Sequence, residues 1–208
     1  MIWGRMYNAG QVCCASKRFL VHNRVRAAFV DKAAARMKTL KVGTPDKEDT
    51  QIACLVTETA ARQVEAQVAR TVEQGGRLML GGRRDGAYFT PTLIDAIPKT
   101  ADVARDLEIF GPVVSVIGFD TLDEAIEIAN ASKFGLAGCI FSADMKTAMK
   151  TAAALECGSV VINGASFYRS FEMPFGGYKY SGLGTEGVLS TFAEVTRLKT
   201  VVLKNVLA

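Results

Sequence analysis

The chain has 208 residues, of which 49% are hydrophobic and 22% are charged, and its formal net charge is +4. This length and balance are typical of one substantial globular domain and exclude a disordered chain. The lysines and arginines are scattered, without a basic run or a basic-aromatic stripe, so we expect no nucleic-acid partner. No apolar stretch reaches the roughly 20 residues that span a bilayer, so we expect no membrane partner.

In chain order, the apolar patterns predict alternating strands and helices. We expect a strand at 18–22, a helix over 29–40, a helix over 61–72, a strand at 77–80, an extended segment over 88–97, a strand at 112–117, a helix over 122–129, a strand at 138–141, a helix over 145–155 and a strand at 159–162. Strands separated by helices of about 10–15 residues are typical of a parallel sheet. The predicted fold class is therefore α/β, a three-layer parallel sheet covered by helices.

The last segment, residues 198–204, is β-prone and has no partner element after it. A terminal strand leaves an unpaired edge, and such an edge can pair with another chain. Pairing within the chain's own sheet is the alternative. We expect residues 1–190 to form the main domain, and residues 191–208 to hold a helix end and a C-terminal strand suited to oligomerisation. A homo-oligomer, either a dimer or a tetramer, follows as an expectation.

The cysteines indicate a reducing, cytoplasmic environment. Their number is odd, their positions lack the paired spacing of a zinc site, and disulfide scaffolds are smaller and richer in cysteine. The start of the chain also lacks the apolar segment of a signal peptide. We expect a cytoplasmic protein with no metal site. The five cysteines are Cys13, Cys14, Cys54, Cys139 and Cys157.

The most informative segment is 8–15, in which small residues precede Cys13 and Cys14. Small residues let backbone N–H groups approach a substrate oxygen, as an oxyanion site requires. A thiol at Cys13 can act as a nucleophile where local dipoles or a cation favour the thiolate. A buried structural cysteine is the commoner role of such a residue. The residues by themselves leave both readings open.

Two other features look functional but are assigned different roles. Residues 182–187 match the dinucleotide fingerprint G-x-G-x-x-G. No apolar strand precedes them and no acidic residue closes a second strand about 20 residues later, so we expect no phosphate site there. His22 ends a predicted strand at some distance from Cys13. A solvated or capping histidine is therefore favoured over a Cys-His catalytic pair.

Three motifs carry a resemblance to a known family. Residues 10–13, with the sequence GQVC, resemble the active-site cysteine motif of the aldehyde dehydrogenase superfamily. Residues 108–113, EIFGPV, are similar to its cofactor-ring motif, and residues 174–177, PFGG, continuing to 181–182, are similar to its late substrate-channel motif. The motifs occur in the family's order across essentially the whole chain. The sequence as a whole resembles the succinate-semialdehyde and lactaldehyde branch of the family.

The resemblance implies a role for each residue that matches a motif. Cys13 matches the nucleophile, and Cys14 is read as a wall of the site. Glu108 matches the residue whose two carboxylate oxygens accept from the nicotinamide ribose hydroxyls. Phe110 matches the ring that packs beside the nicotinamide. By spacing alone, Glu108 could equally be a surface carboxylate and Phe110 an ordinary core aromatic.

The resemblance also implies where substrate binds. Phe175 matches an aromatic that lines the aldehyde tunnel, although a core aromatic is the alternative for it. Ser166 and Phe167 fall in the loop that shapes substrate choice. Semialdehyde enzymes of this family often carry an arginine directly before the N-A-G-Q stretch to bind a distal carboxylate. Tyr7 stands there in this chain, with Arg5 two positions earlier, which puts carboxylate binding in doubt.

The implied chemistry is NAD- or NADP-dependent oxidation of an aldehyde to a carboxylic acid. The Cys13 thiolate adds to the aldehyde carbon, hydride leaves to the nicotinamide, and water hydrolyses the resulting thioester. The cofactor-binding domain, the oxyanion asparagine and the glutamate that activates water lie upstream of this kind of segment in the family and are absent from the 208 residues. We therefore expect this catalytic domain to fold but not to oxidise aldehyde alone.

Two other classes of function stay open on the sequence. A non-redox thiol acyltransferase or hydrolase would use Cys13 to form a thioester without a nicotinamide, and a variant of the dehydrogenase would pass the thioester to coenzyme A. A non-catalytic assembly module would use the terminal strand for oligomerisation alone. Selective alkylation of Cys13 near neutral pH distinguishes an activated thiol from a structural one.

Overall fold

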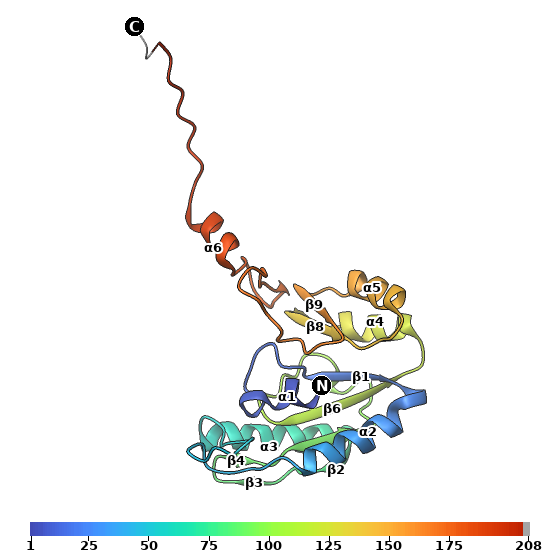
Figure 1. Ribbon diagram of the computed structural model, residues 1–208. Helices are drawn as coiled ribbons and strands as arrows, with labels where there is room; N and C mark the ends of the chain where they lie inside the picture. The colour runs from blue at the N-terminus through green and yellow to red at the C-terminus, as the bar shows by residue number, and fades with distance from the viewer. Residues whose placement is uncertain (206–208) are drawn as a thin grey trace.

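The computed structural model describes residues 1–205, in which a sheet with helices α1 to α3 lies beside a smaller group of elements that contains α4 and α5 (Figure 1). The helix α6 and residues 196–205 extend away from both groups (Figure 1). In chain order the elements are α1 (Ile2–Met6), the short 3-10 helix η1 (Tyr7–Gly10), β1 (Arg18–His22), α2 (Asn23–Lys38), α3 (Glu58–Glu73), β2 (Arg77–Leu80), β3 (Arg84–Asp85), β4 (Tyr88–Phe89), β5 (Thr92–Asp95), η2 (Asp102–Ala104), β6 (Val113–Phe119), α4 (Leu122–Asn130), β7 (Phe134–Gly135), β8 (Ala137–Ile140), α5 (Met145–Ala154), β9 (Ser159–Ile162), β10 (Tyr178–Lys179) and α6 (Val188–Val195).

The main sheet has the strand order β1-β6-β5-β2. Strand β6 pairs in parallel with β1 and with β5, so the predicted parallel core is confirmed. Strand β2 pairs with β5 in the antiparallel sense. The connection from β2 to β5 holds only the short β3–β4 pair, which explains the orientation, because a parallel partner needs a crossover of a dozen or more residues. The observed sheet is therefore mixed, with an antiparallel edge.

The smaller group contains β8 and β9, a parallel pair that is separate from the main sheet. Side chains rather than strand pairing join the two groups. Arg18 of β1 donates hydrogen bonds to the backbone carbonyl of Ile128 at 2.8 Å and to that of Ala129 at 2.8 Å, both in α4. The predicted strands at 138–141 and 159–162 are confirmed, but they form a two-stranded sheet of their own.

The core lies around β6, whose residues from Val113 to Gly118 are all buried. Helix α2 buries Val30, Ala33 and Met37, and α3 buries Ala61, Val64 and Val68. These are apolar residues at helical spacing, as the sequence pattern predicts. The buried face of α3 differs from the predicted one at the last turn, where Thr71 is buried and Val72 is 38% exposed. The Thr71 hydroxyl is satisfied there because it donates to the Gln67 carbonyl at 2.8 Å.

The C-terminal part differs from the rest. Helix α6 has no buried residue, and residues 196–205 form neither helix nor strand. The predicted strand at 198–204 therefore does not join the chain's own sheet, and its pairing with another chain stays a prediction. Residues 206–208 lie outside the described part. Within residues 1–205, no helix combines the length and the apolar character needed to cross a membrane.

Candidate active site

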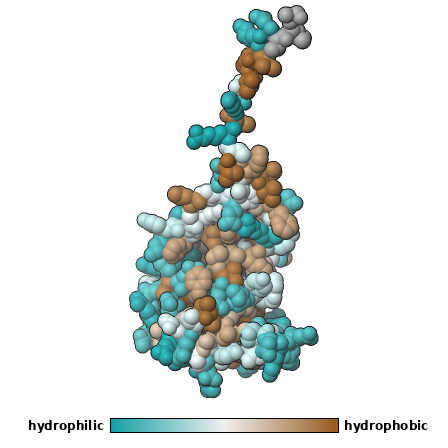
Figure 2. Space-filling view, turned by 90° about the vertical axis from the view of Figure 1, so that its left-hand side faces the viewer, coloured by the Kyte–Doolittle hydropathy of each residue, from teal (hydrophilic) through white to brown (hydrophobic). Residues whose placement is uncertain are grey.

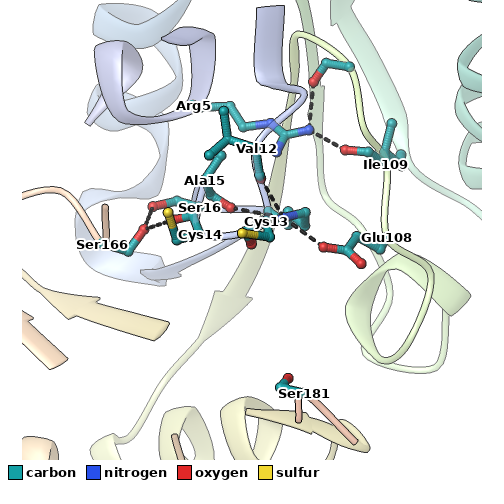
Figure 3. A network of polar contacts seen from close by, with 12 residues as sticks. Arg5, Val12, Cys13, Cys14, Ala15, Ser16, Glu108, Ile109, Ser166 and Ser181 are labelled. Carbon is teal, nitrogen blue, oxygen red and sulfur yellow. Dashed lines mark hydrogen bonds and ion pairs between the residues drawn. The ribbon is translucent and has the colours of Figure 1, made fainter. Parts of the chain in front are cut away.

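The segments that carry Cys13 and Glu108 meet because the strands that follow them are neighbours. Cys13 lies shortly before β1, and Glu108 and Phe110 lie shortly before β6. Since β1 and β6 are parallel and adjacent, with Arg18 opposite Ser115, the segments that enter them come together at one edge of the sheet. Figure 3 shows Cys13 and Glu108 at this meeting point, with Arg5 and Ile109 on one side and Ser166 on the other. The structure therefore brings the first two motifs together.

A strained turn leads into the cysteines. Asn8, Ala9 and Gly10 all have left-handed backbone conformations, with φ of 49°, 52° and 77°. Such conformations are uncommon for residues other than glycine and cluster at functional sites. A Cβ atom at Gly10 would lie 2.1 Å from the backbone oxygen of Gly111. The two motifs therefore pack backbone against backbone, and only glycine leaves room for this contact.

The two adjacent thiols have different surroundings. Cys13 is exposed, whereas Cys14 is partly buried. Burial is the main cause that raises the pKa of the Cys14 thiol, and the negative charge of a Cys13 thiolate raises it further. The thiolate is the nucleophilic form of cysteine. Cys13 is therefore the accessible candidate nucleophile, and Cys14 is held as a thiol that forms part of the wall.

Lys17 joins the cysteine turn to the second motif. Its Nζ donates to the carbonyls of Cys13 at 2.7 Å and Val12 at 3.0 Å, and pairs with Glu108 Oε1 at 2.7 Å. The same ammonium lies 4.8 Å from the centroid of the Phe110 ring. Sequence reasoning missed Lys17. The available signal was a lysine four residues after the candidate nucleophile and directly before a strand.

Arg5 is fully buried beneath the second motif. Its Nε donates to the carbonyl of Val113 at 2.7 Å, and its Nη2 donates to the carbonyl of Gly111 at 2.5 Å and to that of Ile109. Burial lowers the Arg5 pKa to about 10, and the Glu108 charge partly opposes this shift. The Nε and Nη2 donors are committed to these carbonyls, and the Nη1 atom is buried without a hydrogen-bond partner among the described residues. The burial of the whole side chain argues against carboxylate binding by Arg5.

The loop after β9 reaches the cysteine turn. Ser166 is 4% exposed, and its hydroxyl donates to the Cys14 carbonyl at 2.6 Å and lies 3.0 Å from Ser16 Oγ. The Phe167 ring stacks on Tyr7, with centroids 5.5 Å apart, and lies 4.5 Å from the Trp3 ring. The structure thus brings both predicted loop residues to the cysteine segment. Trp3, which sequence reasoning did not single out, completes a cluster of three aromatic rings.

Phe175 lies in a different place. Its ring packs under the Arg169 guanidinium at 4.5 Å, and its backbone pairs with Glu186. Together with residues 176–177 and 181–186 it lines an open cavity of about 330 Å³ that does not include Cys13. Figure 3 shows Ser181, from the same motif, well apart from the cysteines. The structure does not bring the third motif to the site, and the role of Phe175 stays a prediction.

The features assigned other roles have structural explanations. The His22 side chain accepts from the backbone N–H of Arg24 at 3.1 Å and so caps α2, as the capping interpretation predicts. Residues 182–187 follow the exposed two-residue strand β10 rather than a buried parallel strand, so they lack the setting of a dinucleotide fingerprint. Among residues 1–205, no cluster of three or more His, Cys, Asp or Glu residues could hold a metal ion.

Comparisons with known proteins agree with the motifs. The family model described as "Aldehyde dehydrogenase family" matches residues 1–201. The chain is 40% identical over 196 residues to 3-sulfolactaldehyde dehydrogenase of Priestia megaterium, covering 94% of the chain and 41% of that protein. It is 37% identical over 203 residues to lactaldehyde dehydrogenase of Methanococcus aeolicus, covering 97% of the chain and 43% of that protein. The chain thus spans about two fifths of the length of these relatives.

Solved structures have the same fold. Glyceraldehyde-3-phosphate dehydrogenase of Methanocaldococcus jannaschii, complexed with NADP, superposes with a TM-score of 0.92 at 38% identity, covering 96% of this chain and 43% of that one. Aldehyde dehydrogenase 21 of Physcomitrella patens, in complex with succinate, superposes with a TM-score of 0.93 at 35% identity, covering 99% of this chain and 42% of that one. The chain belongs to the aldehyde dehydrogenase family.

Proposed function

We propose that this chain supplies the nucleophile and part of the cofactor site of an NAD(P)-dependent dehydrogenase that oxidises an aldehyde to a carboxylic acid. One observation carries the proposal. Nearly half the chain separates Cys13 from Glu108 and Phe110. The Lys17 ammonium nevertheless contacts the turn that carries Cys13, the Glu108 carboxylate and the Phe110 ring. A purely structural cysteine needs no carboxylate and no half-exposed aromatic ring beside it.

The chemistry begins at the Cys13 sulfur. Its thiolate adds to the aldehyde carbon, forming a carbon–sulfur bond and leaving the charge on the former carbonyl oxygen. Within residues 1–205 the Cys13 backbone N–H donates no hydrogen bond, so it is free to donate to that oxygen. After the carbon is oxidised, Cys13 holds a thioester. Water then cleaves the carbon–sulfur bond, which releases the carboxylic acid and regenerates the thiol.

The residues beside Cys13 fit a nicotinamide cofactor. Phe110 is 42% exposed, and the Glu108 side chain is 34% exposed with only Oε1 held by Lys17. An exposed ring can pack against a flat nicotinamide, and the remaining carboxylate oxygen can accept from ribose hydroxyls. When bound, the oxidised nicotinamide supplies the hydride acceptor. NAD and NADP both fit this proposal, because the two cofactors share the nicotinamide and its ribose and differ only at the adenosine ribose.

The substrate we propose is a small aldehyde of the lactaldehyde and semialdehyde kind. The relatives named for such substrates support this assignment. The ring cluster of Trp3, Tyr7 and Phe167 gives the carbon chain of the aldehyde an apolar wall. Arg5 does not bind a distal carboxylate in this proposal, because the side chain is fully buried and its Nε and Nη2 atoms donate to backbone carbonyls.

Two finer assignments accompany the proposal. We infer a cytoplasmic protein, since all five cysteines are free thiols. We also infer a homo-oligomer, a dimer or a tetramer, in which the exposed residues of α6 and 198–204 contact another copy. The support is a concentration of exposed apolar side chains in this part: Leu189, Phe192, Val195, Leu198, Val201, Val202 and Leu203. Light scattering on the purified protein measures the number of copies.

A chimeric enzyme tests the function. The matching 196-residue segment of the Priestia megaterium 3-sulfolactaldehyde dehydrogenase is replaced by this chain, and the absorbance of reduced nicotinamide is followed with a series of aldehydes. We expect aldehyde-dependent reduction of NAD or NADP by the chimera and none by the 208-residue chain alone.

Two cysteine variants of the chimera complete the test. Cys13→Ser should lower the rate to the uncatalysed level, because a hydroxyl at this place lacks the nucleophilicity of a thiolate. Cys14→Ser, the matched control, should keep the rate within about tenfold, since Cys14 is a wall residue. A folded chimera that cleaves activated acyl esters but never reduces a nicotinamide would instead support a hydrolase.

A further inference from the structure

We propose that Lys17 is a positioning residue, which holds the Cys13 turn and the Glu108 carboxylate in the single arrangement that the reaction needs. This inference rests on the proposed function and assigns it a residue that none of the three motifs contains. Lys17 touches neither aldehyde nor cofactor in this proposal. It acts through the groups that do.

The first support is the geometry of the ammonium. A lysine Nζ has three N–H donors. Here it has three close partners, the Cys13 carbonyl at 2.7 Å, the Val12 carbonyl at 3.0 Å and Glu108 Oε1 at 2.7 Å, with the Ala15 carbonyl farther off at 3.4 Å. All donors are therefore used, and they join two segments about 90 residues apart in sequence.

The second support is burial, which distinguishes this pair from an exposed ion pair of the same length. The side chain of Lys17 is 15% exposed and that of Glu108 is 34% exposed. The pair of Lys41 and Asp49 has the same 2.7 Å separation, but its side chains are 64% and 65% exposed. Water and salt screen an exposed pair strongly and a partly buried pair less. The pair at the site can therefore fix a geometry better than the exposed pair can.

The third support is the orientation that the Val12 carbonyl contact gives to the peptide plane between Val12 and Cys13. In a planar trans peptide, the C=O and the following N–H point in opposite directions. Because the Val12 carbonyl faces the Lys17 ammonium, the N–H of Cys13 is directed away from it. This N–H is the donor proposed above for the substrate oxygen. Lys17 thereby orients an oxyanion donor and a cofactor ligand at the same time.

Charge links Lys17 to the nucleophile as well. Burial is the main cause that lowers the Lys17 pKa, while Glu108 and the charge of a Cys13 thiolate both act to raise it. The same ammonium also holds the backbone on either side of the thiol, at the Val12 and Cys13 carbonyls. Replacing Lys17 should therefore affect both the reactivity of the thiol and the binding of the cofactor.

The first test uses the 208-residue chain and needs no turnover. The rate of Cys13 alkylation by iodoacetamide near neutral pH is measured by peptide mass mapping for the wild type, Lys17→Met, Lys17→Arg and Lys41→Met. We expect Lys17→Met to slow alkylation about tenfold, Lys17→Arg to restore much of the rate, and Lys41→Met to match the wild type. Equal rates for Lys17→Met and Lys41→Met in folded chains would overturn the inference. Far-UV circular dichroism identifies a variant that has not folded.

The second test uses the chimera. Lys17→Met should raise the KM for the cofactor about tenfold and lower kcat, whereas in a Glu108→Gln background it should change the KM by less than about twofold. Additive effects on the KM would overturn the coupling. An inactive wild-type chimera would count against the proposed function alone, because the alkylation comparison would still decide the role of Lys17. If Lys17→Met does not fold, Glu108→Gln replaces it in both tests, and a wild-type KM for that variant would contradict the proposal.

Discussion

The sheet around β6 and the C-terminal segment from α6 onward differ in how far their apolar residues are buried. In β6, Val114, Val116 and Ile117 are completely buried. In α6, Leu189 is 77% exposed and Phe192 is 67% exposed. Figure 2 shows hydrophobic residues along the extended C-terminal segment, where the chain offers them no cover.

This contrast shows that apolar residues stabilise a fold only where other elements cover them. Strand β6 has a hydrogen-bonded neighbour on each side and helices packed on the sheet. Helix α6 is two turns long, and a helix this short depends on tertiary packing for its stability. The candidate active-site residues Cys13, Glu108 and Phe110 belong to the first region. We therefore expect changes near β1 and β6 to destabilise the chain, and changes in α6 to leave its stability nearly unaltered.

The largest effect should come from Gly10→Ala. The new Cβ would lie 2.1 Å from the Gly111 oxygen, and φ at this position is 77°. We expect the free energy of unfolding to fall by about 4 kcal/mol, measured by urea denaturation. The control is Gly86→Ala, where φ is 55° but no atom lies within 4 Å of the added Cβ. It should cost about 1 kcal/mol, and an equal loss in both variants would show that close packing of the two motifs is unimportant.

A smaller loss is expected for Arg5→Met. The substitution leaves the carbonyls of Ile109, Gly111 and Val113 without the guanidinium, although it also removes the cost of burying a charge. We expect a decrease of about 3 kcal/mol in the free energy of unfolding. Arg24→Met on the exposed side of α2 is the matched control and should change it by less than about 0.5 kcal/mol. A stable Arg5→Met chain would mean that the second motif holds its shape without these hydrogen bonds.

The smallest effect should come from Phe192→Ala in α6. The ring is 67% exposed, so its removal takes little apolar area out of the folded state. In dilute monomer the free energy of unfolding should change by less than about 0.5 kcal/mol. Phe89→Ala, at a ring that is only 1% exposed, should cost about 4 kcal/mol in the same assay. A large loss for Phe192→Ala that grows with protein concentration would show that another copy covers the helix.

The fold could be predicted from the sequence where local patterns and tertiary packing agree. The strand at 18–22, the helix faces of α2 and α3 and the buried strand at 113–117 follow from spacing and hydrophobicity. The direction of β2 was missed, because the strand's own residues do not encode it and its partner β5 is known only from the structure. Helix α1 was missed because five residues are too few for a periodic pattern to be recognised.

Some residues of the candidate site could likewise be predicted from the sequence, and others could not. The motifs pointed to Cys13, Glu108 and Phe110, and their positions before two strands made a meeting point possible. Lys17 and Arg5 could not be assigned, because a lysine or arginine in a sequence is as easily a solvated surface residue as a buried donor. Only the partners of a charged group distinguish the two cases, and those partners lie about 90 to 110 residues away.

The sequence by itself determined the α/β class, the candidate nucleophile and the residues beside it, because backbone periodicity and short motifs are local properties. The tertiary structure alone decided that β1 and β6 are neighbours, that Gly10 meets Gly111, and that one lysine joins a turn to a carboxylate. These are contacts between distant segments, whose energies depend on burial and orientation, and neither can be read from neighbouring residues in the chain.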